Sequence, residues 1–396
     1  MQSENDLLVA QCSGRIKVMA VTGIRSEYDL MFPLLEELER SDSFELLVVV
    51  TGSHLTALHN YSVSEIEKDG FCIAARIQTD IAQDDTGHRV KACAQLMTSL
   101  ADVISVHRPD LLLVLGDREE PLVTAMVGNY MAVPVVHLAG GDSTNPEGGN
   151  VDEQARHATT KLSHLHLAMT PMHKSRILQL GEEEWRVHSV GSGGVDRLRL
   201  TPVLSINELA IQSGLKVDSP YAVLIHHPLN GQNLLAIEEI NAAVLAAKEQ
   251  GLHLIIGAPN SDPGSTAIFQ HIQNIRDCEI YYNLPRVEFI NLLRHATVLL
   301  GNSSLAFHEA DYLGLPALNI GARQTGRLHS GHVVFTESTA DSVKKALHYV
   351  LHDEAFRSQL KKGISFYGDG YMAEKSLQIL LQLPIKSKLI AKHLTY

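Results

Sequence analysis

The chain has 396 residues, of which 45% are apolar and 20% are charged, and its formal net charge is −12. This length exceeds what one ordinary core supports, so we expect two domains. The acidic balance argues against a broad electrostatic footprint on nucleic acid or anionic lipid. The low aromatic content, 5%, favours aliphatic parallel sheets over sandwiches and barrels.

Targeting and redox features indicate a cytoplasmic protein. The N-terminal stretch MQSENDLLVAQCSG lacks the basic region and the continuous apolar region of a secretory signal. No apolar run approaches the ~20 residues that span a bilayer. The four cysteines lie far apart in the sequence, as is typical of free thiols in a reducing compartment: Cys12, Cys72, Cys93 and Cys278.

Short apolar runs alternate with longer helical segments along the whole chain. The runs begin with IKVMAVTG, FELLVVVTGSH and DLLLVLGD, and continue in the second half with YAVLIHHP, LHLIIGAPN and ATVLLGNSS. This alternation predicts βαβ units and parallel sheets buried on both faces. We therefore expect an α/β protein with two Rossmann-like, doubly wound domains, 1–198 and 199–372, a cleft between them, and a final helical segment, 373–396. The glycine-rich stretch GSGGVDRLRLTPVLS marks the joint.

Polar residues gather where the predicted strands end, and they indicate a functional site. In open α/β sheets the ligand crevice lies outside the carboxyl ends of the strands. Ordinary loops also contain turn residues there, but not so many His, Arg and Asp. In the first half the candidates are Arg25 as a phosphate donor in TGIRSEYD, Asp117 and Arg118 in GDREEP, and Asp142, Asp152 and Glu153 in the segment that follows HLAGG.

Carboxylates and imidazoles gathered in this way suit general acid–base chemistry. A divalent metal site is the alternative, but these candidate residues show no HxxxH or DxD spacing, so we expect neither a metal nor another cofactor. No GxGxxG or Walker A sequence is present, which removes the main signatures of dinucleotide and P-loop sites.

The second half of the chain adds residues suited to a nucleotide. His227 ends the strand of LIHHPLN, and Asn260 in GAPNSDPGS can hydrogen-bond a base or a sugar. In GNSSLAFHEA, Ser303 and Ser304 can cap the next helix, whose N-terminus attracts phosphate. We expect this helix to include Glu309, either as an acceptor for ribose hydroxyls or as a solvated residue.

Two arginines complete the second cluster. Arg323 and Arg327 lie in NIGARQTGR, on a tight loop with Gly321 and Gly326. The planar guanidinium donates two parallel hydrogen bonds and stays charged, so arginine suits a diphosphate.

With these motifs in view, the chain resembles the UDP-N-acetylglucosamine 2-epimerases, on the hydrolysing side of that family, from about residue 18 to residue 373. The motifs that carry the resemblance are TGIRSEYDL, GDREEPL, HLAGGD with VDEQARHATTKLSHLH, HHP, PNSDPGS, GNSS with GLPALNIGARQTGR, and YGDG. The resemblance implies the GT-B fold, a UDP-sugar substrate, no metal, a homodimer or homotetramer, and a last helix that returns to the first domain.

The resemblance also implies a reaction and roles for single residues. Hydrolysing members eliminate UDP to give a 2-acetamidoglucal and then add water, which releases N-acetylmannosamine for sialic acid synthesis. Asp117, Asp152 or Glu153, and His227 look like the acid–base set. The UDP contacts would be Arg25, Arg118, Asn260, Ser303, Ser304, Glu309 and Arg323.

One departure leaves the sugar and the base open. Many relatives carry glutamate in HxExG, where this chain has Ala139, so that carboxylate is absent unless Asp142 substitutes for it. The alternatives are the same reaction on a UDP-2,4-diacetamido-2,4,6-trideoxyhexose of the legionaminic acid pathway, a non-hydrolysing epimerase, a GT-B glycosyltransferase, and a UDP-sugar sensor without catalysis.

Overall fold

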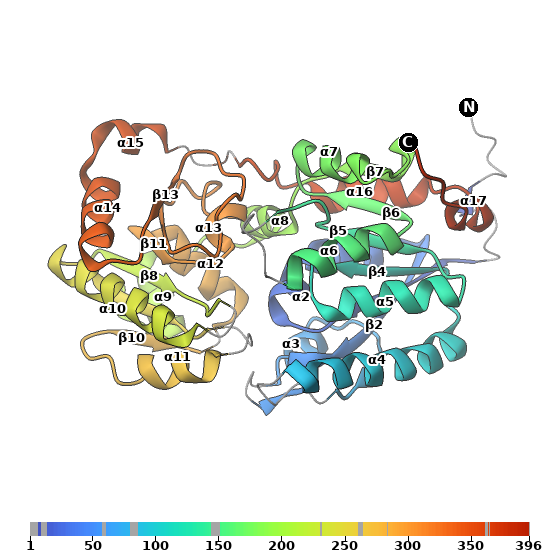
Figure 1. The fold of residues 1–396 in the computed structure, drawn as a ribbon, viewed down its shortest axis with the longest axis horizontal. Coiled ribbons are helices and arrows are strands. Elements are labelled where there is room, and N and C mark those ends of the chain that lie inside the picture. The colour runs from blue at the N-terminus through green and yellow to red at the C-terminus, as the bar shows by residue number, and fades with distance from the viewer. Residues whose placement is uncertain are drawn as a thin grey trace. The chain divides into compact units, whose positions relative to one another are not determined.

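Two parallel β-sheets organise the chain, and helices connect most successive strands (Figure 1). The computed structural model describes residues 7–8, 14–57, 61–79, 86–143, 151–229, 232–259, 264–282, 284–360, 363 and 365–395. Contacts divide the chain into a first unit, Met1–Asp142 with Asn150–Asp196 and Gly370–Tyr396, and a second unit, Ser143–Gly149 with Arg197–Asp369. The predicted α/β class with two Rossmann-like parallel sheets is confirmed. The domain boundaries at 198 and 372 stay predictions.

The first unit contains a seven-stranded sheet in the order β3-β2-β1-β4-β5-β6-β7, and every neighbouring pair is parallel. Its central strands are apolar and buried along nearly their whole length, as expected for a sheet covered on both faces. The strands are β1 (Ile16–Thr22), β2 (Phe44–Thr51), β3 (Ile73–Ile77), β4 (Leu111–Leu115), β5 (Val135–Leu138), β6 (Leu165–Ala168) and β7 (Val187–Ser189).

The helices of the first unit include the last segment of the chain. They are α2 (Arg25–Arg40), α3 (Val63–Lys68), α4 (Thr86–His107), α5 (Glu119–Tyr130), α6 (Val151–Leu162), α7 (Pro171–Gln179), α8 (Gly193–Leu200), α16 (Met372–Leu381) and α17 (Lys386–Ile390), with 3₁₀ helices at Gly52–Leu55 and Glu184–Arg186. Helix α8 runs across the boundary between the two units.

The second unit repeats the same strand order on six strands, β10-β9-β8-β11-β12-β13, again parallel throughout. The strands are β8 (Tyr221–Ile225), β9 (His253–Gly257), β10 (Glu279–Tyr281), β11 (Val298–Gly301), β12 (Ala317–Ile320) and β13 (Val333–Thr336). The helices are α9 (Ile206–Ser213), α10 (Asn233–Glu249), α11 (Ser265–Ile272), α12 (Arg286–His295), α13 (Leu305–His308), α14 (Ala340–His352) and α15 (Glu354–Gln359).

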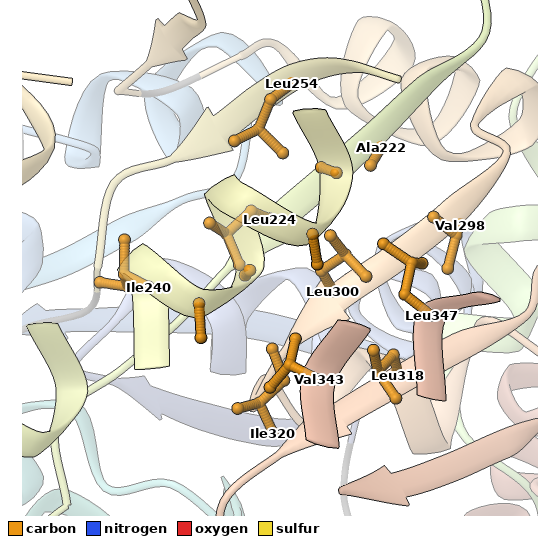
Figure 2. Close-up of a cluster of buried hydrophobic side chains, with 14 of the residues drawn as sticks. Ala222, Leu224, Ile240, Leu254, Val298, Leu300, Leu318, Ile320, Val343 and Leu347 are labelled. Atoms are coloured by element: carbon orange, nitrogen blue, oxygen red, sulfur yellow. The ribbon is translucent and has the colours of Figure 1, made fainter. Parts of the chain in front are cut away.

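The core of the second unit shows why α10 packs closely on its sheet. The buried face of α10 is rich in alanine, which lets the helix backbone lie near the strands. Figure 2 shows strand and helix side chains meeting there, among them Leu224, Leu300, Leu318, Ile240 and Leu347. Each fully buried Leu or Ile contributes about 1.5–3 kcal/mol. This packing fixes the strand ends, and therefore the loops that follow them.

The C-terminal segment is attached to the first unit by specific contacts. Both carboxylate oxygens of buried Asp196 accept backbone N–H groups at the start of α16, from Met372 and Ala373, at 2.8 Å each. Arg186 donates to the carbonyl oxygens of Leu389 and Ala391 at 2.7 and 2.6 Å. The chain end therefore completes the first unit, although it follows the second unit in sequence.

Two further predictions concern membrane-spanning helices and the cysteines. In the described part of the chain, no helix is long and apolar enough to cross a membrane. Cys72, Cys93 and Cys278 are free thiols, and Cys12 lies outside the described residues.

Candidate active site

Each sheet reverses its strand order at one place, and the predicted site residues lie near these two points. In the first unit the reversal falls between β1 and β4, and Asp117 follows the end of β4. In the second it falls between β8 and β11, which are followed by His227 and Asn302. In open parallel sheets, ligands bind beyond the strand ends at such reversals.

A buried arginine gathers the predicted acid–base residues of the first unit. Arg156 lies on α6, and one of its terminal nitrogens donates to Glu153 at 2.6 Å and to the carbonyl oxygen of Asp142 at 3.2 Å. Its other terminal nitrogen forms an ion pair with Asp117. Burial acts to lower the pKa of Arg156, but Asp117, Asp142 and Glu153 together raise it above its ordinary value. The guanidinium therefore stays charged and balances the carboxylates.

The carboxylates of this group differ in their access to a ligand. The side chains of Asp117 and Glu153 are 30% and 23% exposed, whereas that of Asp142 is only 3% exposed and faces buried His173, with 3.3 Å between Oδ1 and Nε2. Asp152, in the first turn of α6, is half-buried. Asp117, Asp152 and Glu153 are thus partly accessible, whereas the carboxylate of Asp142 is buried beside His173.

Sequence reasoning missed a second group of carboxylates beside Arg118. Glu27 and Glu120 are buried in the first turns of α2 and α5, and the Nε atom of Arg118 lies 3.7 Å from Glu120. In the described part of the chain, Oε1 of Glu27 and Oε2 of Glu120 have no hydrogen-bond partner. Burial and the neighbouring carboxylates raise the pKa of Glu27 well above its ordinary value, and that of Glu120 to about 7.

An acid in the first turn of a helix is the ordinary pattern at a helix start, so SEYD and DREEP carried no signal of these two buried groups. Arg25 also lies in this region, as the first residue of α2. Its Nε atom is 3.1 Å from Glu65 and 3.7 Å from Asp29.

Asn302 organises the predicted residues of the second unit. Its side chain accepts the backbone N–H of His227 at 2.8 Å and donates to the carbonyl oxygen of His227 at 2.9 Å. Its own carbonyl oxygen accepts Arg323 at 3.2 Å and Gln324 at 2.8 Å. Ser303 accepts the backbone N–H of Leu305 at 3.4 Å, and Ser304 occupies the N-cap position of α13. The structure therefore brings His227, both serines and Arg323 together.

The helix expected to carry Glu309 is shorter than predicted. Helix α13 is a single turn that ends at His308, and Glu309 follows it as a half-buried cap residue with φ −136° and ψ −37°. The turns that follow use Asp311, whose carboxylate accepts the backbone N–H groups of Tyr312 and Phe366 at 2.8 Å each. Such side-chain to backbone bonds compete with helix continuation.

Arg327, Asn260 and the question of a metal complete the predicted site. A terminal nitrogen of Arg327 lies 3.3 Å from Nε2 of His308, at the end of α13. Asn260 lies outside the described residues. Within the described ranges, no group of three or more His, Cys, Asp or Glu side chains is arranged to hold a metal ion.

A known protein family matches most of the chain. The profile of the UDP-N-acetylglucosamine 2-epimerase family matches residues 36–381. The chain is 34% identical to the UDP-N,N'-diacetylbacillosamine 2-epimerase (hydrolyzing) of Legionella pneumophila, over 95% of this chain and 98% of that protein. It is 30% identical to the GDP/UDP-N,N'-diacetylbacillosamine 2-epimerase (hydrolyzing) of Campylobacter jejuni, over 81% of this chain and 84% of that protein.

A solved structure shows the same fold. The UDP-GlcNAc 2-epimerase of Neisseria meningitidis bound to UDP-GlcNAc superposes with a TM-score of 0.76 at 21% identity, covering 92% of this chain and 99% of that chain. The fold is therefore GT-B-like, as the resemblance implied. The family match covers most of its length, and the two relatives named above are at least 30% identical to it, so the chain belongs to the UDP-N-acetylglucosamine 2-epimerase family.

Proposed function

We propose that this protein is a hydrolysing 2-epimerase that acts on a UDP-2,4-diacetamido-2,4,6-trideoxyhexose and releases UDP and the free 2-epimerised sugar. The observation that carries the proposal is the pair of relatives above, which both bear the name of a hydrolysing diacetylbacillosamine 2-epimerase. A UDP-N-acetylglucosamine 2-epimerase from Neisseria meningitidis is 28% identical over 84% of the chain, so UDP-N-acetylglucosamine is the second candidate substrate.

The carboxylates around Arg156 suit the proton transfers of this reaction. A carboxylate takes the weakly acidic proton from C2 while the bond between C1 and the UDP oxygen breaks, and the bonding electrons leave with UDP. Water then adds at C1, and a proton returns to C2 on the opposite face. Asp117, Asp152 and Glu153 are the candidates for these transfers, and the charge of Arg156 balances those of Asp117 and Glu153.

The residues gathered at Asn302 suit the leaving group. Negative charge develops on the diphosphate as the C1–O bond breaks, and preorganised donors stabilise it. The candidate donors are Ser303 and Ser304, in the turn after β11, and Arg323, in the turn after β12, and Glu309 is the candidate acceptor for the ribose hydroxyls. His227, held at its backbone by Asn302, is the proposed acid beside the diphosphate. This chemistry requires no metal.

Ala139 supports the choice of a deoxy sugar. It follows β5 in a left-handed conformation with φ 63° and lines a small cavity of about 10 Å³. The other lining side chains are mostly apolar, among them Leu115, Leu138 and Leu167. Where the resemblance implies glutamate, this chain thus has no side-chain acceptor for a sugar hydroxyl, which suits a substrate that lacks one.

The test is a proton NMR time course with each of the two UDP-sugars, with chelator present. We expect free 2-epimerised sugar and UDP, formed faster from the diacetamido substrate. Asp117→Asn should lower turnover about a hundredfold or more, whereas Asp102→Asn, on the exposed face of α4, should not change it.

Each other outcome would identify a rival. An epimerised UDP-sugar without free sugar would indicate a non-hydrolysing enzyme, and turnover only with an added acceptor would indicate a glycosyltransferase. Binding of UDP-sugar without turnover would indicate a sensor. We further propose that the protein is cytoplasmic and forms a homo-oligomer. Size-exclusion chromatography with light scattering would test the oligomeric state.

A further inference from the structure

Glu239 connects three loops at the carboxyl end of the second sheet. It lies on α10 and is only 5% exposed. Its Oε2 is 2.7 Å from Nε2 of His226, in the loop after β8, and its Oε1 accepts the hydroxyl of Ser338, in the loop after β13, at 2.5 Å. Both oxygens of a buried carboxylate are therefore used, each on a different loop.

The loop that carries Arg323 is also built around this carboxylate. Gly321 follows β12 with φ +78°, and a Cβ atom at this position would lie 2.1 Å from Oε1 of Glu239. Any other residue at 321 would displace the carboxylate and would also be strained. Glu239 therefore sets how closely the GARQTGR loop approaches the strand ends.

The contact between His226 and Asn302 extends this arrangement to the proposed ligand contacts. A distance of 2.7 Å from a carboxylate assigns the proton of His226 to Nε2, which donates to Glu239. Asn302 Nδ2 lies 3.2 Å from that nitrogen and donates to the carbonyl oxygen of His227. Because Asn302 also accepts Arg323, a movement of the His226 ring would be felt at both His227 and Arg323.

We propose that Glu239 is a positioning residue: through His226 and Asn302 it holds the loops of His227 and Arg323 in the geometry that binds a nucleoside diphosphate and supports its departure. Glu239 touches neither ligand nor reacting atoms in this scheme. The inference rests on the proposed function, since it assigns the diphosphate to these loops. Displacements of about 1 Å in such a support can cost a hundredfold in rate.

The experiment compares Glu239→Gln with Glu238→Gln. The two residues are neighbours on α10, but Glu238 is exposed, so the control makes the same chemical change on the outer face of the helix. We expect Glu239→Gln to weaken UDP binding about tenfold or more by calorimetry and to lower kcat more than KM changes. In nitrogen-selective NMR, the Nε2 proton of His226 should give a protected downfield signal that moves upfield in this variant, because a neutral amide oxygen is a weaker acceptor than a carboxylate. Glu238→Gln should match the wild type in all three measurements.

The outcomes separate this proposal from the proposed function. Wild-type protein that binds no UDP would overturn the proposed function itself. If the wild type binds UDP and Glu239→Gln has the same UDP affinity and the same kcat, the positioning role alone is overturned. If Glu239→Gln does not fold, His226→Gln, which keeps Glu239 and removes the imidazole, should show the same loss of UDP affinity, and normal affinity there would overturn the proposal.

Discussion

At the residue scale, Glu120 shows how burial changes the chemistry of an ordinary side chain. Its carboxylate packs against Gly23, where an added Cβ atom would lie 2.3 Å from Oε1. The same acid on a solvated helix start would be ionised at neutral pH and would favour the helix. Here burial and the nearby Glu119 outweigh the attraction of Arg118 and raise its pKa to about 7. Glu120 therefore releases its proton near physiological pH.

Glu120→Gln should change the pH dependence of stability. Between the ordinary pKa of 4.5 and about 7, the folded state keeps a proton that the unfolded state loses. The contribution of this group to the free energy of unfolding therefore falls as pH rises through that window, and stays low above it. Glutamine cannot ionise, so we expect the variant to be more stable than the wild type at pH 8 by at least about 1 kcal/mol, and nearly equal at pH 4.5.

Glu119→Gln is the matched control, with the opposite sign. Burial acts to raise the pKa of Glu119, but Arg118 and Arg89 outweigh it and lower the pKa. Its stabilisation is present above the ordinary pKa and is lost as pH falls, so this variant should be less stable than the wild type at pH 8. Urea unfolding midpoints at pH 4.5 and 8 measure the stability of both variants against the wild type. Identical pH profiles for wild type and Glu120→Gln would contradict the assignment.

At the scale of the element, the strands were easier to predict than the ends of the helices. Apolar runs such as LLLVL predicted β4 because a strand buried on both faces is apolar throughout. Helix α13 stopped short of its expected end because Asp311 binds backbone groups of a turn, one of them at Phe366. Helix α16 begins at Met372 on an acceptor 176 residues away, Asp196. The local sequence pattern cannot predict partners that lie so far away along the chain.

Asp196→Ala should detach the start of α16. The substitution removes both acceptors from the first N–H groups of the helix, at a cost of about 1–2 kcal/mol, which is typical of a lost cap. We expect faster amide exchange over residues 372–381 by mass spectrometry. The control is Asp353→Ala, which removes the side-chain acceptor of Phe356 at the start of α15 in the second unit. Unchanged exchange of α16 in Asp196→Ala would show that packing alone holds the helix.

At the scale of the whole molecule, the chain contains the same sheet order twice. Each unit has its own apolar cluster, one centred on β1 and β4 and the other on β8, β11 and β12. Two cores of this size favour two unfolding steps over one. The proposed UDP contacts are divided unequally, because Ser303, Ser304, Glu309, Arg323 and Arg327 all belong to the second unit.

UDP should therefore stabilise one unfolding step more than the other. A ligand that binds only the folded state adds about 2.7 kcal/mol at a hundredfold excess over Kd. In calorimetry with and without UDP, we expect the larger rise in Tm for the transition of the second unit. Arg323→Ala should remove most of that rise, and chelator should leave it unchanged. A larger rise for the first unit would contradict the placement of the nucleotide contacts.

The sequence by itself determined the fold class and the family of this protein. Both are determined by buried runs, their alternation with helices and the ordered motifs from TGIRSEYDL to GARQTGR. These are local features, so they can be recognised in the sequence without the tertiary structure. The sequence also placed Asp117 and Arg323 at strand ends, where parallel sheets collect their ligands.

Only the tertiary structure decided how those residues are paired. Asp117 meets Arg156 across 39 positions, and Ser338 meets Glu239 across 99. Whether a carboxylate is ionised, shared with a histidine or left to keep its proton depends on the charges and the water around it. Folding brings those neighbours from distant parts of the chain, so no local pattern records them.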